Sequence, residues 1–358
     1  MSDGTITMSD VVDNEGVSCR PAPTCILCGQ ERAVLYPKQR DRFFSAPGIW
    51  DVRWCPPCEL AWLDPRPFPE EVVKLYESYY THELVPSSTS HLQTLRRWLR
   101  DGVLGTWMGY EELVRSPVHR MLGWVLGWPH SIRDVVGLSV MTLVADQRGW
   151  LLDVGCGNGQ FLARMRDLGW DVAGVEPDPS AARIARQRFG LNVYNGILEG
   201  ISLREQSFDA ITMNHVAEHL HDPVGTFRRC GRLLKGNGLL VIITPNLRSI
   251  GHRFWRSSWR GLEIPRHLFL FTGKSLAACL GRAGLAVRSM RTTSRSASWI
   301  WRVSAEKARS GLVASAFPSQ RARSLLAGWS VQLLESSFPW NTWAGEELIV
   351  AAGPCQRD

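Results

Sequence analysis

One stretch, residues 150–168, limits the possible folds more than any other. Trp150 to Val154 is a short apolar run of the kind found in buried parallel strands. Three glycines then stand at alternate positions, Gly155, Gly157 and Gly159. Gln160 to Leu168 continues with apolar residues at helical spacing. Glycines at such a turn let the backbone bend tightly and let a ligand approach it closely, so the stretch predicts an α/β fold that binds a ligand here.

A second strand ends in an acid at a meaningful distance. Asp171 to Val175 is apolar in its second half and leads into Glu176, about 20 residues beyond the glycines. At that separation an acidic residue meets a ribose hydroxyl in nucleotide-binding βαβ units. A dinucleotide site would need the spacing G-x-G-x-x-G, whereas this chain has G-x-G-x-G with Asp153 two residues before it.

This arrangement resembles the first motif of class I S-adenosylmethionine (SAM) methyltransferases. The resemblance implies an α/β, Rossmann-like fold with a seven-stranded sheet, in which the glycine loop passes under the amino-acid part of SAM and the acid binds the ribose. Leu198 and Glu199 then fall near the adenine, although Glu199 could equally be a solvated residue. The residues implied in cofactor binding are Asp153, Gly155, Cys156, Gly157, Gly159, Glu176, Pro177, Leu198, Asn214 and His215. The alternative is a structural glycine turn in another α/β protein.

The fourth strand, Phe208 to Met213, is followed by polar residues where open α/β sheets place their ligands. The run Glu218-His219-Leu220-His221-Asp222-Pro223 resembles the motif of ubiquinone-type and sugar methyltransferases. In the sugar C-methyltransferases the histidine of this pair is assigned as the general base, which falls here on His219, with Glu218 beside it. His215 is a second candidate. The alternatives are histidines that only hold the loop and SAM, or a divalent metal near Glu218 and His219.

Two C-x-x-C pairs precede the catalytic region. Their four thiolates, Cys25, Cys28, Cys55 and Cys58, match the ligand pattern of a structural zinc site, and the segment resembles a zinc ribbon. A redox role is the alternative, but one such pair would suffice for it and neither follows a βαβ strand. Cys19 is expected to be a free thiol.

Basic residues concentrate between Val224 and Lys274, where ten lysines and arginines accompany a single acid, Glu263. A segment containing Pro265-Arg266-His267-Leu268 resembles one that is common in ribbon-bearing methyltransferases and is expected to overhang the methyl-transfer site. The expected acceptor-binding residues are Arg260, Arg266 and His267, within a cationic wall that would grip phosphate or carboxylate. Solvated surface arginines are the alternative.

Tryptophan and arginine are interspersed from His91 to Arg148, a region expected to form amphipathic helices. Packing against the catalytic domain is one interpretation. The others are a lid over an apolar substrate and a helix in a membrane interface, with residues 91–130 as the contact.

These patterns divide the chain into four parts: a disordered tail at 1–20, a zinc ribbon at 21–65, a linker and helical lid at 66–148, and a SAM-binding domain at 149–358 with a helical insert at 293–342. No apolar run reaches the roughly 18 residues that span a bilayer, and the polar start shows no signal-peptide pattern. A cytoplasmic protein with reduced cysteines is therefore expected.

The expected function is transfer of a methyl group from SAM to an O or C atom of a small anionic metabolite, such as a nucleotide-sugar, a natural product or a lipid-linked intermediate. The cofactors are SAM and a structural zinc ion. The alternatives are an RNA methyltransferase, which the net charge of +7 favours only weakly, and a non-catalytic zinc-ribbon interaction protein.

Overall fold

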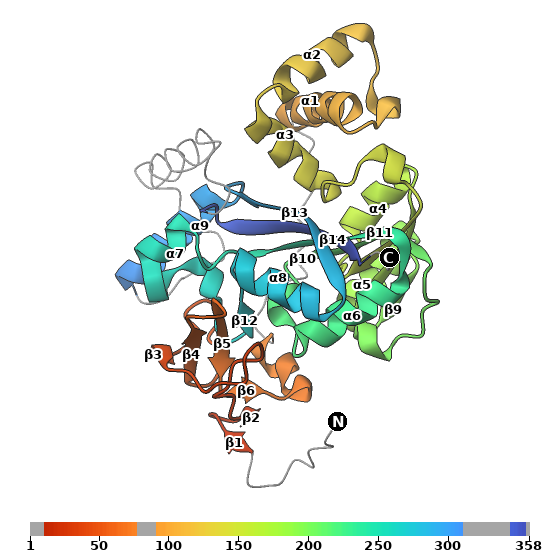
Figure 1. The fold of residues 1–358 in the computed structure, drawn as a ribbon. Coiled ribbons are helices and arrows are strands. Elements are labelled where there is room, and N and C mark those ends of the chain that lie inside the picture. The colour runs from red at the N-terminus through yellow and green to blue at the C-terminus, as the bar shows by residue number, and fades with distance from the viewer. Residues whose placement is uncertain (1–10, 77–90, 311–343, 356–358) are drawn as a thin grey trace.

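A seven-stranded sheet forms the centre of the chain in the computed structural model, which describes residues 11–76, 91–310 and 344–355 (Figure 1). Its strands lie in the order β13-β14-β11-β10-β7-β8-β9. They are β7 (Trp150–Val154), β8 (Asp171–Glu176), β9 (Val193–Asn195), β10 (Phe208–Asn214), β11 (Leu234–Pro245), β13 (Leu285–Thr293) and β14 (Glu347–Pro354). Only β14 runs antiparallel to its two neighbours. The expected Rossmann-like sheet of seven strands is confirmed.

Helices cover both faces of this sheet, because alternate strand residues point to opposite sides. Leu151 and Leu152 are both fully buried, yet they belong to two different hydrophobic clusters. The main helices are α4 (Gln160–Asp167), α5 (Pro179–Phe189), α6 (Pro223–Leu233) and α8 (Gly273–Arg282). The strand order reverses between β7 and β10, and ligands bind in α/β sheets at the carboxyl ends of strands at such a point.

The ribbon is built into the rest of the chain. Its four-stranded sheet has the order β12-β5-β4-β3, with β3 (Val34–Gln39), β4 (Trp50–Cys55), β5 (Leu60–Asp64) and β12 (Phe269–Leu270). The strand β12 comes from the catalytic half and pairs Phe269 with Trp62 and Leu270 with Ala61. A ribbon confined to residues 21–65 is therefore wrong, because its sheet takes one strand from far along the chain.

The expected disordered tail is also wrong for residues 11–20. Strands β1 (Val12–Asp13) and β2 (Ser18–Arg20) form a small sheet with β6 (Arg66–Pro67). Val17 and Cys19 are fully buried there, so two apolar side chains order a segment whose overall composition is polar. Cys19 is a free thiol, as expected.

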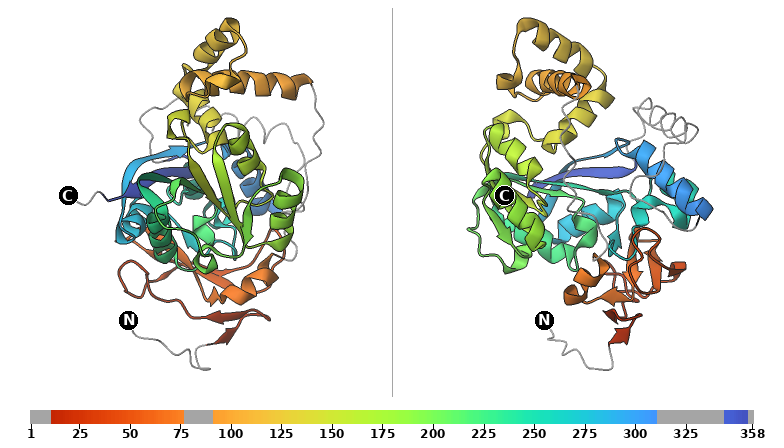
Figure 2. Two further views of the ribbon diagram at one scale, coloured as in Figure 1. Left: turned by 90° about the vertical axis from the view of Figure 1, so that its right-hand side faces the viewer. Right: turned by 180° about the vertical axis from the view of Figure 1, so that it is seen from behind.

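Three helices form a layer at the end of the molecule opposite the ribbon (Figures 1 and 2). They are α1 (His91–Trp107), α2 (Pro117–Gly127) and α3 (His130–Gly137). Leu104 and Leu138 join the hydrophobic cluster that contains Leu151, so this layer packs on the catalytic domain. The alternative role of these helices, as a lid over an apolar substrate, stays a prediction.

Two further helices, α7 (Ile250–Trp255) and α9 (Ala297–Ser310), lie near the ribbon, as does the 3₁₀ segment η2 (Pro69–Leu75). Shorter 3₁₀ segments, among them η7 (Ala217–His219), make up several of the connections. Helix α9 confirms the start of the expected helical insert, and the rest of that insert, from residue 311, lies outside the described residues. No helix in the described ranges is long and apolar enough to cross a bilayer.

Candidate active site

The turn from β7 to α4 has the conformation that its glycines permit. Gly155, Gly157 and Gly159 have φ of 73°, 54° and 81°, in the left-handed region that favours glycine. A Cβ on Gly155 would lie 2.5 Å from Val216, and one on Gly159 would lie 2.6 Å from Leu191. A Cβ on Gly157 would meet no atom within 4 Å. Two glycines therefore allow close packing, while Gly157 faces open space where a ligand can approach.

The acid at the end of β8 contacts this turn directly. Glu176 Oε2 accepts a hydrogen bond of 2.7 Å from Gly157 N, and its Oε1 accepts one of 2.9 Å from Asp178 N. The predicted ribose-binding carboxylate thus lies at the predicted glycine loop. Pro177, which follows Glu176, is exposed, and so is Asn214, the last residue of β10. Both stand at the carboxyl ends of their strands. The open position at Gly157 beside a carboxylate fits SAM.

Three other predicted cofactor residues are buried. Asp153 accepts a hydrogen bond of 2.7 Å from Thr212 Oγ1, which joins β7 to β10, and burial raises the pKa of Asp153 to about 7. Cys156 packs against Gly174, and burial raises its pKa. Leu198 is 2% exposed and belongs to the hydrophobic core. These three residues shape the site from behind, and a direct contact with SAM stays a prediction for each.

His215 bridges two carboxylates. Its Nδ1 lies 3.2 Å from Glu218 Oε1, and its Nε2 lies 2.8 Å from Glu347 Oε1. Burial disfavours the charged imidazole, but the hydrogen bonds to both carboxylates outweigh it and raise the pKa of His215 to about 10. Burial opposes the charge of Glu218 too, yet His215 lowers the pKa of Glu218 to about 2. Both contacts favour the protonated imidazole, which suits a bridge between two carboxylates, and a role of His215 as a base stays a prediction.

His219 is held from one side. Its Nδ1 lies 2.9 Å from the backbone oxygen of Arg266 and 3.1 Å from the hydroxyl of Tyr76. A carbonyl oxygen only accepts hydrogen bonds, so we assign the proton to Nδ1 and the lone pair to Nε2. His267 packs against this ring with centroids 4.8 Å apart. Burial, followed by the neighbouring His219, lowers the pKa of His267 to about 4, so His267 is neutral.

Glu218, His219 and His267 form a compact group whose potential ligand atoms lie within 4.8 Å of one another. Glu218 Oε2 also accepts a hydrogen bond of 2.8 Å from Thr244 Oγ1. A divalent cation is compatible with two imidazoles and a carboxylate, so a metal near Glu218 and His219 stays a prediction.

Arg260 and Arg266 do not form the expected cationic wall, because both are engaged in ion pairs. Arg266 is 2% exposed and lies 2.9 Å from Asp41 Oδ2 and 3.3 Å from Glu263 Oε1. Arg260 pairs with the other oxygen of Glu263, and its guanidinium lies over the ring of Phe43. These charges are matched inside the protein by acids, one of them in the ribbon. The remaining predicted acceptor residue, His267, does lie beside His219.

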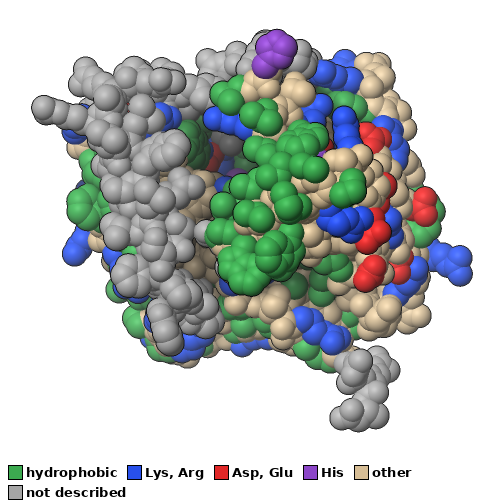
Figure 3. All heavy atoms as spheres, turned by 90° about the horizontal axis from the view of Figure 1, so that it is seen from above, with side chains coloured by type: hydrophobic (Ala, Val, Ile, Leu, Met, Phe, Trp, Pro, Cys, Tyr) green, Lys and Arg blue, Asp and Glu red, His purple; other side chains and the backbone are tan. Residues whose placement is uncertain are grey.

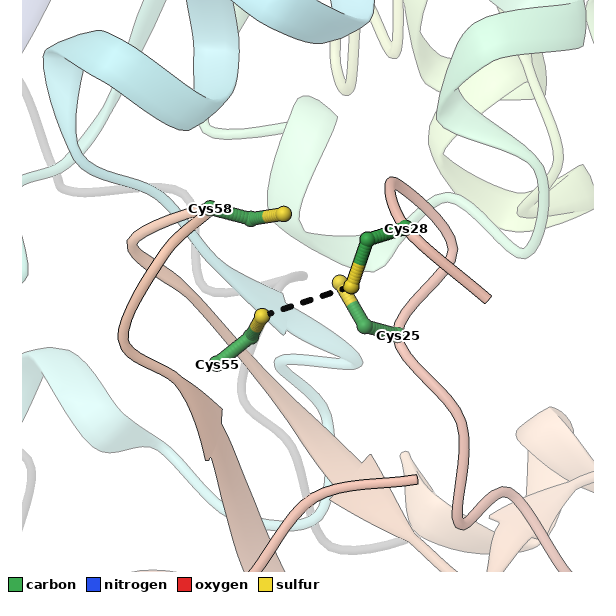
Figure 4. A group of neighbouring side chains, drawn as sticks. All are labelled: Cys25, Cys28, Cys55 and Cys58. Carbon is green, nitrogen blue, oxygen red and sulfur yellow. Dashed lines mark hydrogen bonds between the residues drawn. The ribbon is translucent and has the colours of Figure 1, made fainter. Parts of the chain in front are cut away.

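The four ribbon cysteines meet at one point (Figure 4). The sulfur atoms of Cys25, Cys28, Cys55 and Cys58 lie within 4.8 Å of one another, and the Cys28 and Cys55 sulfurs are 3.6 Å apart. A zinc tetrahedron with bonds of about 2.3 Å separates its sulfurs by about 3.8 Å. The N–H of Gln30 and then Arg32 lower the pKa of Cys28 to about 6, which favours its thiolate. The group fits a tetrahedral thiolate-bound metal.

Sequence reasoning missed several residues of the site. Tyr76, Glu347, Glu263 and Asp41 complete it, and they come from the linker, the last strand, the basic segment and the ribbon. Glu263 was the one acid among ten basic residues, and that isolation was the signal that could have marked it as their internal partner. No comparable local pattern marks the other three.

Residues 128–290 match a family described as a methyltransferase domain. This part of the chain is a class I SAM-dependent methyltransferase domain. The domain is 36% identical over 101 residues to a ubiquinone biosynthesis O-methyltransferase of Cereibacter sphaeroides, a match that covers 27% of this chain and 41% of the relative. It is 34% identical over 106 residues to the protein of that name from Glaesserella parasuis, covering 27% and 45%. The chain thus spans less than half the length of these relatives.

Solved structures resemble the methyltransferase domain at low identity. A SAM-dependent methyltransferase from Mesorhizobium loti is 15% identical with a TM-score of 0.43, and the match covers 61% of this chain and 97% of that one. The [4+2]-cyclase SpnF is 20% identical with a TM-score of 0.42, covering 63% and 84%.

Proposed function

We propose that this chain transfers the methyl group of SAM to an oxygen or carbon atom of a small molecule, with His219 as the general base. The observation that carries the proposal is the hydrogen bond of His219 Nδ1 to the carbonyl of Arg266, because it leaves Nε2 as a proton acceptor. Oxygen is favoured as the acceptor atom, since the curated relatives reported above are O-methyltransferases by name.

The sulfonium of bound SAM supplies a methyl group that is already electrophilic. The protein's part is to hold the cofactor at Gly157 and Glu176, to align the acceptor, and to take its proton. His219 lies at the carboxyl end of the same sheet, beyond β10, where an acceptor would meet the methyl group. Glu218 and Glu347 hold protonated His215, which fixes the loop between β10 and His219.

The internal ion pairs favour a small molecule over RNA. The net charge weakly favoured RNA, but Arg248 pairs with Glu59, while Arg260 and Arg266 pair with Glu263 and Asp41. Phosphate binding on a surface needs arginines whose charge is available. The same pairs occupy the two arginines expected to grip an anionic acceptor, Arg260 and Arg266, so we propose only that its reactive group carries an ionisable proton.

We also propose that the ribbon holds one structural Zn²⁺ through Cys25, Cys28, Cys55 and Cys58. The support is the cluster of four sulfurs at tetrahedral spacing. The chemistry of methyl transfer does not require this ion.

Methyl-labelled SAM with purified protein and fractionated extract of the source organism tests the proposal. Label in a soluble or lipid metabolite is expected, whereas label in RNA or protein would overturn the small-molecule assignment. A chain that does not bind SAM would support the non-catalytic alternative.

His219→Gln then tests the base. Transfer should fall by roughly 10²- to 10⁴-fold while SAM affinity is kept. His221→Gln is the matched control, because His221 is a nearby histidine whose Nε2 bonds the backbone oxygen of Pro67 rather than lying free toward the site. An unchanged rate in His219→Gln would remove His219 from the mechanism.

A further inference from the structure

Helix α2 presents an apolar face to solvent. Five of its side chains or immediate neighbours are about half exposed or more: Val118 (60%), Met121 (58%), Trp124 (49%), Val125 (52%) and Trp128 (64%). Ile132 and Val135 in α3 are each 41% exposed. Figure 3 shows hydrophobic side chains gathered on the upper face, where α1 to α3 lie. An exposed apolar patch of this kind marks a binding surface.

The opposite face of α2 is locked onto α1 by glycines. A Cβ on Gly123 would lie 2.2 Å from the carbonyl oxygen of Gly102, and one on Gly127 would lie 2.3 Å from the indole nitrogen of Trp107. The two helices are therefore in backbone contact, and α2 cannot turn its apolar face inward without losing that contact. The apolar face of α2 is therefore held at the surface by the packing of the two helices.

Two arginines border this surface, and one of them has an acidic neighbour. Between Pro117 and Gly127 the sole charged residue is Arg120, whose guanidinium lies 3.7 Å from exposed Glu111, and Arg115 precedes the helix. An exposed pair of this kind is weak and leaves Arg120 able to turn toward an anionic surface. Both arginines line a groove of about 630 Å³, together with Val114, Met121 and Trp124. Apolar side chains beside two guanidinium groups match a molecule with an apolar chain and an anionic head.

We propose that α2 docks on the interfacial layer of an anionic lipid bilayer, with Trp124 and Trp128 inserted and Arg115 and Arg120 against the lipid headgroups. Tryptophan and arginine are favoured at that depth, and each basic residue near an anionic surface contributes attraction. This inference is independent of the proposed function.

Co-sedimentation with vesicles tests it on the full chain. Binding is expected to vesicles of phosphatidylcholine with phosphatidylglycerol and should weaken with salt, while pure phosphatidylcholine binds less. Trp124→Ser with Trp128→Ser should lower the partition coefficient about tenfold or more. Arg115→Gln with Arg120→Gln should remove the preference for the anionic lipid.

Trp150→Ser is the matched control, since Trp150 is 48% exposed in β7, outside this patch. Circular dichroism and SAM binding should be unchanged in all variants, which separates loss of docking from loss of folding. Failure of the wild-type chain to bind either vesicle would overturn the proposal. So would a concentration-dependent dimer, seen by sedimentation velocity, that the tryptophan variant abolishes.

Discussion

Asp41 and Arg266, 225 positions apart in the sequence, form a fully buried ion pair. Asp41 Oδ2 lies 2.9 Å from Arg266 Nη1, and neither side chain is exposed. The backbone oxygen of the same arginine accepts the hydrogen bond of His219. A single residue, Arg266, therefore connects the ribbon to the proposed base His219.

Removing the charge of Asp41 should weaken both the fold and the site. Asp41→Asn leaves the guanidinium of Arg266 without its ribbon counter-charge, and we expect the free energy of unfolding to fall by about 3 to 5 kcal/mol in a urea titration. Glu15→Gln is the control, because Glu15 pairs with Arg40 at the surface and should matter little. Equal stability of Asp41→Asn and wild type would show that the pair does not carry this energy.

Removing zinc should act at a distance from the cysteines. Metal analysis should find one zinc ion per chain, and a chelator should unfold the ribbon. Since Leu63 N bonds Leu268 O and Leu268 N bonds Glu218 O, hydrogen exchange should rise together in β5 and β12. Methyl transfer should be lost while SAM binding is kept. Full activity in a metal-free chain would contradict this coupling.

Two glycines of the same turn should respond differently to alanine. Gly159→Ala places a methyl group 2.6 Å from Leu191 and 2.8 Å from Ala185, so it should cost about 2 to 4 kcal/mol of stability. In Gly157→Ala the new methyl group meets no other atom within 4 Å. Only the left-handed backbone at this position is unfavourable for alanine, and it should lower the free energy of unfolding by about 1 to 2 kcal/mol. Its SAM affinity should nevertheless fall at least about tenfold, because the methyl group fills the space beside Glu176. Thermal unfolding and calorimetric titration with SAM separate the two effects; unchanged SAM affinity in Gly157→Ala would place the cofactor elsewhere.

The pH dependence of stability should reveal His215. Its pKa is about 10 in the folded chain against 6.5 for an unperturbed histidine, so the folded state binds the extra proton between these values. The contribution is complete below pH 6.5 and is lost as the pH rises through 10. Melting temperature should therefore drop more between pH 7 and pH 9.5 in wild type than in His215→Gln. Parallel curves for the two proteins would refute the bridge.

Local patterns were sufficient for the sheet and the turn. The sequence from Trp150 onward changes from an apolar run to glycines and then to helical spacing, which predicted a strand, a turn and a helix. The distance from these glycines predicted that Glu176 lies at the turn, where it accepts a hydrogen bond from Gly157. The two C-x-x-C pairs likewise predicted their own meeting point. The strand, turn and helix are encoded by neighbouring residues, and the zinc-type site is encoded by four cysteines at a recognisable spacing.

The errors share a different cause. Arg266 looked available because its partner Asp41 lies far away in the sequence. The bridge at His215 was not foreseen because one of its two carboxylates, Glu347, comes from the final strand. Residues 11–20 looked disordered because the sheet that orders them includes Arg66 and Pro67. Charge and order were both decided by contacts that no local window contains.

The pairing of β5 with β12 also bears on how the chain is made. Synthesis proceeds from the N-terminus, so Leu60–Asp64 leaves the ribosome about 200 residues before Phe269–Leu270 exists. Until then one edge of the ribbon sheet has no strand beside it, and unpaired strand edges invite association with other chains. Early capture of zinc by the first 58 residues would hold β4 and β5 together through that interval. If the ribbon holds the proposed zinc ion, its supply during translation would then affect the yield of folded chain.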